Sequence, residues 1–124
     1  MVTALMIKPG QQPEITQLCD DRAFLDLAVS RDTGLTCTAV AMPLEKDIAV
    51  IYPEEGFSLC LPGNRRVNDR IIAGTFYIAG VKGGEPRSLT DAEITKYASM
   101  FWEIEVFDDD EVFDSWFCDV FEPL

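Results

Sequence analysis

The side chains best equipped for chemistry in this sequence are carboxylates, and they are concentrated at its C-terminal end. Of the 124 residues, 22 are acidic and 10 are basic, which gives a net charge of −12. The last part of the chain contributes nine acids and no base: Glu103, Glu105, Asp108, Asp109, Asp110, Glu111, Asp114, Asp119 and Glu122. The residues before Glu103 therefore have a net charge of only −3, from 13 acidic and 10 basic residues. We expect the acidic end to repel nucleic acids and anionic membranes and to attract a basic protein.

The four adjacent acids from Asp108 to Glu111 do not predict a metal site. A calcium loop places oxygen ligands at alternating positions around a glycine, and this run contains no glycine. The chain has no histidine, and its four cysteines, at positions 19, 37, 60 and 118, form no Cys-x-x-Cys pair. Zinc is therefore not expected, and reduced thiols fit a protein of the cytoplasm.

The residues that catalysis usually needs are missing. Without histidine, neither a Cys–His nor a Ser–His–Asp arrangement can form. The many carboxylates show no spacing that singles out two of them as an acid and a base. The glycines of residues 80–84 match neither phosphate-binding pattern, and Gly83-Gly84 predicts a turn. We expect a protein that is not an enzyme and that requires no cofactor.

One basic cluster stands out at residues 64–70, which contain Asn64, Arg65, Arg66, Asp69 and Arg70. The segment reads as a polar loop before a strand, a common place for function. An arginine can hold a phosphate or carboxylate with two parallel hydrogen bonds, so Asn64, Arg65 and Arg70 form a candidate site for an anionic ligand such as a nucleotide. The alternative is structural: Asn64 and Asp69 close a turn, and an arginine neutralises nearby acids.

Hydrophobic periodicity predicts a single small α+β domain, with a mixed or antiparallel sheet of about five to six strands and two to three helices. Strands are expected at residues 1–7, 14–18, 35–42, 47–52, 57–61 and 71–80, with a polar break over 62–69. The run 71–80 is apolar on both faces, which is typical of a central strand, and Gly74 within it indicates a bulge or a close backbone approach.

Three helices are expected. The first begins at Asp20 or Asp21 and runs to about Ser30, with an apolar face of Ala23, Phe24, Leu27 and Ala28. The second runs from Asp91 to about Phe101, and Thr90 with Glu93 has the spacing of a capping box.

The C-terminal residues 102–124 are predicted to form a strand and an amphipathic helix that pack on a core of residues 1–101. Trp102, Ile104 and Val106 alternate with glutamates, as in a short strand. The helix would begin at the acidic run, which suits the helix dipole. Its apolar stripe consists of Phe113, Trp116, Phe117, Val120 and Phe121, which either pack on the core or contact a partner.

A resemblance adds a biological setting. Pro62 to Arg65, the run Ile71 to Phe76, and Ser88 to Asp91 before a helix together resemble a family known only as a domain of unknown function. The resemblance covers about residues 1–101 and includes the early Pro9-Gly10 turn. It implies a protein of bacteriophages and other mobile elements of bacteria, and it implies no activity.

The leading functional hypothesis is a non-enzymatic inhibitor or regulator that occupies the basic, nucleic-acid-binding face of a host protein, such as a restriction enzyme or a CRISPR effector. It would work in the cytoplasm of a bacterial host and contact no nucleic acid or membrane itself. Its binding residues would be Asp108, Asp109, Asp110, Glu111, Asp114 and Trp116. Two alternatives remain: an anionic-ligand domain that uses the basic cluster, and a homo-oligomer, in the simplest case a homodimer, held together by the aromatic stripe.

Overall fold

A computed structural model of the chain describes residues 1–19, 21–31, 36–56 and 58–117. The strands are β1 (Val2–Ile7), β2 (Glu14–Leu18), β3 (Ala39–Glu45), β4 (Ile48–Pro53), β5 (Gly63–Val67), β6 (Arg70–Ala73), β7 (Phe76–Lys82) and β8 (Glu85–Arg87). The helices are α1 (Arg22–Ser30), α2 (Asp91–Met100) and α3 (Asp109–Phe117). The predicted α+β class, with three helices and a C-terminal acidic helix, is confirmed.

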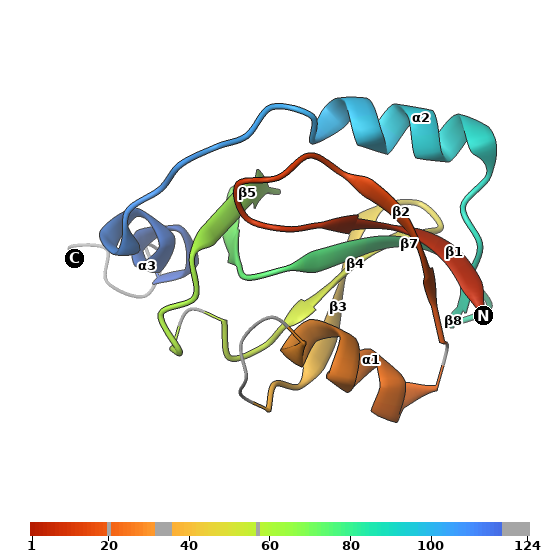
Figure 1. Cartoon of the computed structure of the whole chain (residues 1–124), viewed down its shortest axis with the longest axis horizontal. Coiled ribbons are helices and arrows are strands. Elements are labelled where there is room, and N and C mark those ends of the chain that lie inside the picture. The colour runs from red at the N-terminus through yellow and green to blue at the C-terminus, as the bar shows by residue number, and fades with distance from the viewer. Residues whose placement is uncertain (20, 32–35, 57, 118–124) are drawn as a thin grey trace.

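The main sheet has six strands and is antiparallel throughout, which settles the choice between a mixed and an antiparallel sheet. Its strand order is β2-β1-β7-β4-β3, with β8 also paired to β7. Strands β5 and β6 form a separate antiparallel hairpin. Figure 1 shows α1 below the sheet and α2 above it, so each face of the sheet is covered by one helix.

The two faces of the sheet form two apolar clusters, because successive side chains of a strand point to opposite sides. Toward α2, Ile48 and Val50 of β4 pack in one cluster with Tyr97 of the helix. Toward α1, Ile51 of β4 packs with smaller residues such as Ala39 and Ala79. The α2 side therefore holds most of the large side chains of the core.

The segment 71–80 is not the single strand that its apolar sequence predicts. Gly74 has a φ of +89°, a conformation that residues with a side chain rarely adopt, and it ends β6. The chain then enters the main sheet as β7, its central strand, whereas β6 pairs with β5. The glycine thus separates two strands that belong to different sheets.

Two further strand predictions are wrong. Residues 58–61 form no second arm of a hairpin; Leu59 and Leu61 donate main-chain hydrogen bonds to Glu55 and Gly56 in consecutive turns. The segment expected to be a polar break, 62–69, contains β5 instead. The second error has a clear cause: β5 carries the buried polar side chains of Asn64 and Arg65, which hide its strand character.

The apolar face of α1 is also displaced from its prediction. Leu25, Ala28 and Val29 pack against the sheet, at helical spacing i, i+3 and i+4. Phe24 and Leu27, which were expected to be buried, have 57 % and 64 % of their surface exposed. The buried stripe of α1 is therefore shifted by about one residue along the sequence from the stripe that was predicted.

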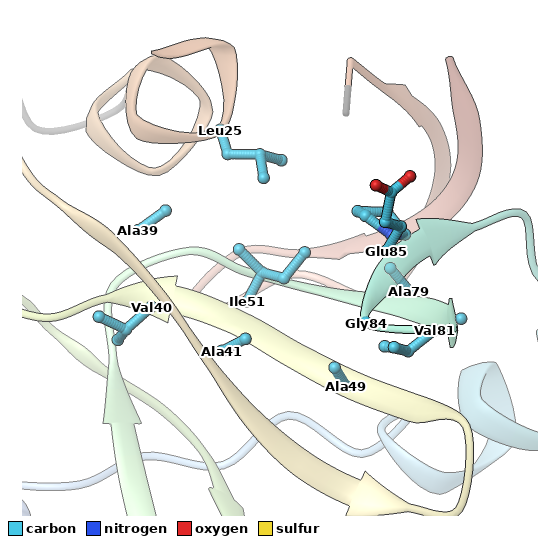
Figure 2. A pocket seen from close by; sticks show the side chains of 12 residues that line it. Leu25, Ala39, Val40, Ala41, Ala49, Ile51, Ala79, Val81, Gly84 and Glu85 are labelled. Atoms are coloured by element: carbon cyan, nitrogen blue, oxygen red, sulfur yellow. The ribbon is translucent and has the colours of Figure 1, made fainter. Parts of the chain in front are cut away.

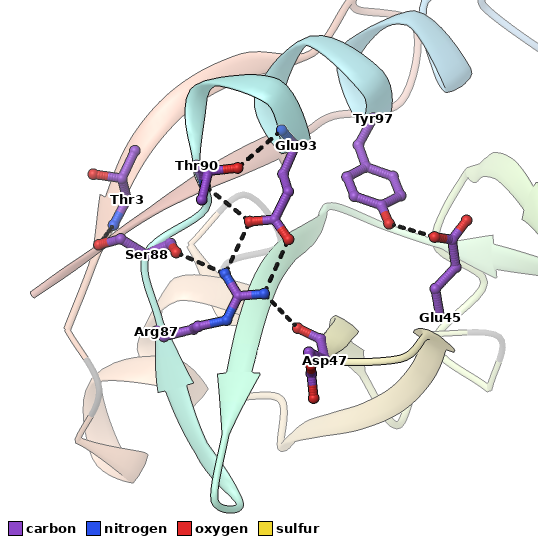
Figure 3. Close-up of polar contacts among 8 residues, drawn as sticks. All are labelled: Thr3, Glu45, Asp47, Arg87, Ser88, Thr90, Glu93 and Tyr97. Atoms are coloured by element: carbon purple, nitrogen blue, oxygen red, sulfur yellow. Dashed lines mark hydrogen bonds and ion pairs between the residues drawn. The ribbon is translucent and has the colours of Figure 1, made fainter.

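The N-terminus of α2 is fixed by a network of charged groups (Figure 3). The predicted capping box is confirmed: Glu93 N–H donates to Thr90 Oγ1, and Thr90 N–H donates to Glu93 Oε1 at 2.9 Å. Arg87 of β8 forms two hydrogen bonds to the Glu93 carboxylate, at 2.8 and 2.9 Å, and donates to the carbonyl of Asp47. The pKa of Glu93 falls from 4.5 to about 2, chiefly because of the hydrogen bonds from Arg87 and next because of the one from the Thr90 main chain.

The conformation of Gly74 can be tested with Gly74→Ala. An added Cβ would adopt an unfavourable positive φ and would lie 2.9 Å from Leu61 Cδ1, so we expect the free energy of unfolding to fall by about 2–3 kcal/mol. Gly10→Ala is the control, because Gly10 has a φ of +73° with open space around it, and should cost about 1 kcal/mol. Urea denaturation measures both; equal losses would show that the contact with Leu61 is unimportant.

The Glu93 network predicts a dependence of stability on pH. A carboxyl whose pKa is lowered by folding stabilises the folded state above its unfolded pKa, and this contribution is lost as the pH falls through the folded pKa. The stability advantage of the native chain over Glu93→Gln should therefore be complete above about pH 4.5 and should disappear as the pH approaches 2. Glu103→Gln, at an exposed site, controls for the change of net charge. A constant difference between the native chain and Glu93→Gln across this range would contradict the assignment.

Candidate protein-binding surface

Asn64, predicted as a ligand-binding residue, is completely buried. Its Nδ2 donates to the carbonyl of Ile7, at 2.8 Å, and to that of Gly74, at 2.9 Å. These two carbonyls belong to the end of β1 and to the break between β6 and β7. Asn64 therefore joins the small hairpin to the main sheet, and both hydrogens of its amide are used inside the protein.

Arg65 is buried as well, with 1 % of its surface exposed. Its Nε donates to the carbonyl of Phe101 at 3.0 Å, and its Nη2 donates to that of Gln11 at 2.7 Å. Its Nη1 donates to Asn64 Oδ1 at 2.9 Å. Burial lowers the pKa of the guanidinium, and the charge of Glu105 acts in the opposite direction.

The placement of these two residues changes the interpretation of the basic cluster. The donors of Asn64 and Arg65, which the sequence analysis assigned to an anionic ligand, are bonded to acceptors within the protein. The cluster was expected to lie in a polar loop before a strand, and arginine is rarely buried. Here the guanidinium is stabilised by carbonyl oxygens, and no pattern in the sequence signals such a partner.

Arg70 and Trp116 were assigned to different predicted sites, and the structure places them in contact. The Arg70 Cζ atom lies 4.9 Å from the centre of the Trp116 ring. Trp116 also donates from Nε1 to the carbonyl of Ile71 at 2.8 Å, and its ring lies 5.7 Å from that of Tyr52. Trp116 thus anchors α3 to the β5–β6 hairpin.

Among the described side chains of α3, Val112, Ser115 and Trp116 face the β5–β6 hairpin. Val112 is 3 % exposed, and Ser115 Oγ accepts a hydrogen bond from the main chain of Ile71. Phe113, the first residue of the predicted stripe, is 43 % exposed instead. The side chain of Phe117, and Val120 and Phe121 as a whole, lie outside the described residues.

The predicted strand at 102–106 is absent. These residues belong to a connection from α2 to α3, which crosses the top left of Figure 1 and which we call the arm (residues 102–108). Glu105 Oε2 accepts a hydrogen bond from the main chain of Arg66, and the Arg66 Cζ atom lies 5.8 Å from the ring centre of Phe107. The side chains of Glu105 and Phe107 therefore attach the arm to β5.

The opposite side of the arm is exposed and apolar. Val106 is 89 % exposed, and Trp102 and Ile104 are each nearly half exposed. The acids beside them are also exposed, and we call this set the acidic surface: Glu103, Asp108, Asp109, Asp110, Glu111 and Asp114. Asp108 and Glu111 also cap α3, because each side chain accepts a hydrogen bond from the main chain of the other. All five predicted partner-binding acids thus lie on the surface, next to apolar side chains that the sequence analysis did not assign to it.

A separate apolar hollow of about 260 Å³ lies on the α1 side of the sheet (Figure 2). Leu25 of α1 stands at one side of it, and Ala41, Ala49 and Ala79 contribute to its floor. Its one charged lining residue is Glu85, at the rim. The hollow does not coincide with any residue of the predicted sites.

The described residues contain neither a group of side chains suited to a metal ion nor a membrane-spanning helix. No three of the histidine, cysteine, aspartate and glutamate side chains there are grouped so that they could hold an ion. No helix in the same part of the chain is long and apolar enough to cross a membrane.

Comparison with known proteins identifies a family. A family model described as a domain of unknown function, DUF3846, matches residues 2–102. The match covers the sheet, α1 and α2, and it ends where the arm begins. No curated protein and no solved structure matches the chain.

The internal role of Arg65 predicts a large effect of Arg65→Met on stability. The variant leaves the acceptors on Phe101, Gln11 and Asn64 without their donor, and each buried acceptor left unpaired costs about 1–3 kcal/mol. We expect a loss of about 3 kcal/mol or more in urea denaturation. Arg66→Met, on the same strand, is the control, and it should cost less than about 1 kcal/mol because it removes only an exposed contact with Phe107. Equal losses of stability in Arg65→Met and Arg66→Met would mean that the buried hydrogen bonds of Arg65 stabilise the fold no more than the exposed contact of Arg66 does.

Proposed function

We propose the following function on the basis of the acidic surface of this chain, which belongs to the DUF3846 family. The chain is a non-enzymatic inhibitor or regulator encoded by a phage or mobile element, and it acts in the cytoplasm of a bacterial host. It binds the basic face with which a host protein, such as a restriction enzyme or CRISPR effector, contacts nucleic acid. The chain itself binds neither nucleic acid nor membranes.

The observation that carries the proposal is the concentration of exposed carboxylates on the acidic surface. Six of them lie within residues 103–114, a segment without a single basic residue. Ion pairs join Arg87 to Glu93 and Lys96 to Glu45, and none of these residues belongs to the acidic surface. The acidic surface therefore presents a strong negative field to solvent.

Such a field suits competition with nucleic acid. Lysine and arginine side chains that bind phosphates also attract carboxylates, and long-range attraction speeds the encounter of oppositely charged proteins. Charge alone gives little specificity, so a tight complex also needs apolar contacts that exclude water. Trp102, Ile104, Val106 and Phe113 lie exposed among the acids and can supply these contacts.

A homodimer is the second candidate, favoured by a different exposed patch. Met1, Phe24 and Leu27 are exposed near α1 and line a hollow of about 460 Å³. In a homodimer, two copies would bury this apolar patch against each other. Light scattering that finds a monomer would exclude it. The third candidate, an anionic-ligand domain, has lost the donors of Asn64 and Arg65 to internal hydrogen bonds.

The proposal is tested with the triple variant Asp109→Asn, Asp110→Asn and Asp114→Asn, which spares the capping pair Asp108 and Glu111. The native chain, immobilised in a bacterial lysate at low salt, should retain a nucleic-acid-binding protein that duplex DNA displaces. The triple variant should retain it at least about tenfold less well, and the salt dependence of binding should weaken.

The matched control removes three exposed acids elsewhere, through Glu14→Gln, Glu85→Gln and Asp91→Asn. It changes the net charge equally and should leave the capture intact. Equal losses in both variants would show that net charge alone matters. A captured protein that DNA does not displace would contradict competition for a nucleic-acid-binding face.

A further inference from the structure

The arm has the side-chain pattern of a strand but no strand beside it. From Trp102 to Val106, apolar residues alternate with glutamates, the two-residue period of an extended chain. Within the part of the chain that the structure describes, none of the paired strands includes these residues. A segment with this alternation and these exposed apolar groups is suited to pairing with a strand of another protein.

The nearest strand of the protein itself, β5, does not pair with the arm. Its Arg66 N–H donates to the side chain of Glu105 at 3.2 Å, where a neighbouring strand would offer a main-chain carbonyl. Glu105 and Phe107 face β5, whereas Val106 is almost fully exposed. The arm is therefore held to the protein by one set of side chains, and it presents the other set to solvent.

A second copy of the arm is also a poor partner. In an antiparallel pair centred on Ile104, Glu103 of each copy would stand opposite Glu105 of the other. Like charges directly opposite on paired strands are destabilising. The same rule states what a good partner needs: lysine or arginine beside the glutamates, and apolar, preferably β-branched, residues beside Trp102, Ile104 and Val106.

We propose that the arm binds by adding a strand to the exposed edge of a partner sheet whose edge strand alternates basic and apolar residues. This inference rests on the proposed function and specifies its mode of recognition: the acidic surface attracts the basic partner, and main-chain pairing along residues 102–106 fixes the register. The apolar side chains of the arm then pack on those of the partner strand, and Glu103 pairs with a basic residue.

The test uses two synthetic peptides of the same composition as probes. One alternates lysine and valine over about eight residues, a typical strand length, and the other places all lysines before all valines. The alternating peptide should bind the native chain at least about tenfold more tightly, and its binding should slow amide hydrogen exchange at residues 103–106.

Proline variants at two successive positions isolate the main-chain contribution. Successive N–H groups of a strand point to opposite edges, so pairing along one edge uses the N–H of residue 104 or that of residue 105. Ile104→Pro and Glu105→Pro each remove one of these groups, and one of the two variants should abolish the preference for the alternating peptide. Ile104→Val and Glu105→Gln keep both N–H groups, so they should preserve the preference. Both positions lie outside the helices and strands, and thermal denaturation verifies that the four variants fold like the native chain.

The outcomes separate this inference from the proposed function. Equal affinity for both peptides, or no change in exchange at residues 103–106, overturns strand addition, even if the Asp109, Asp110 and Asp114 variant still weakens binding. An unchanged affinity of that triple variant for both peptides counts instead against the acidic surface as the source of attraction. A preference for the alternating peptide that survives both Ile104→Pro and Glu105→Pro also overturns strand addition.

Discussion

The buried guanidinium of Arg65 is the interaction on which the arrangement of this protein depends. Taking a charge out of water is costly, and it is tolerated where hydrogen-bond acceptors surround the group. Here two acceptors come from distant parts of the sequence, Gln11 after β1 and Phe101 at the end of α2, and a third is the side chain of the preceding residue, Asn64. The arm begins at the residue after Phe101. The hydrogen bond from Arg65 to Phe101 therefore also fixes the point at which the arm leaves the core.

The other arginines of the basic cluster attach the acidic end of the chain to the core. Arg66 lies over the ring of Phe107 and Arg70 over that of Trp116, so both cations lie against aromatic faces. Val112 and the indole N–H of Trp116 complete the attachment of α3 to the small hairpin. This arrangement turns the aromatic groups of α3 inward in part and leaves its carboxylates in solvent, where they are available for a basic partner.

The elements that the sequence predicted well are those with strong local signals. The capping box of Thr90 and Glu93 marks the start of α2, and the acidic run marks the start of α3. Predictions failed where distant contacts decide the outcome. Residues 102–106 alternate like a strand but find no strand beside them, and β5 forms a strand around polar residues, since Asn64 and Arg65 have acceptors that only the folded chain supplies.

By itself, the sequence determined the α+β class, the acidic C-terminal end and the lack of histidine, because composition and short-range periodicity carry this information. Only the tertiary structure decided which polar groups are available to a partner. It placed Asn64 and Arg65 inside, turned Trp116 onto Arg70, and left Trp102, Ile104 and Val106 exposed beside the acids. The physical reason is that burial and hydrogen-bond partners depend on segments far apart in the chain, which local patterns do not encode.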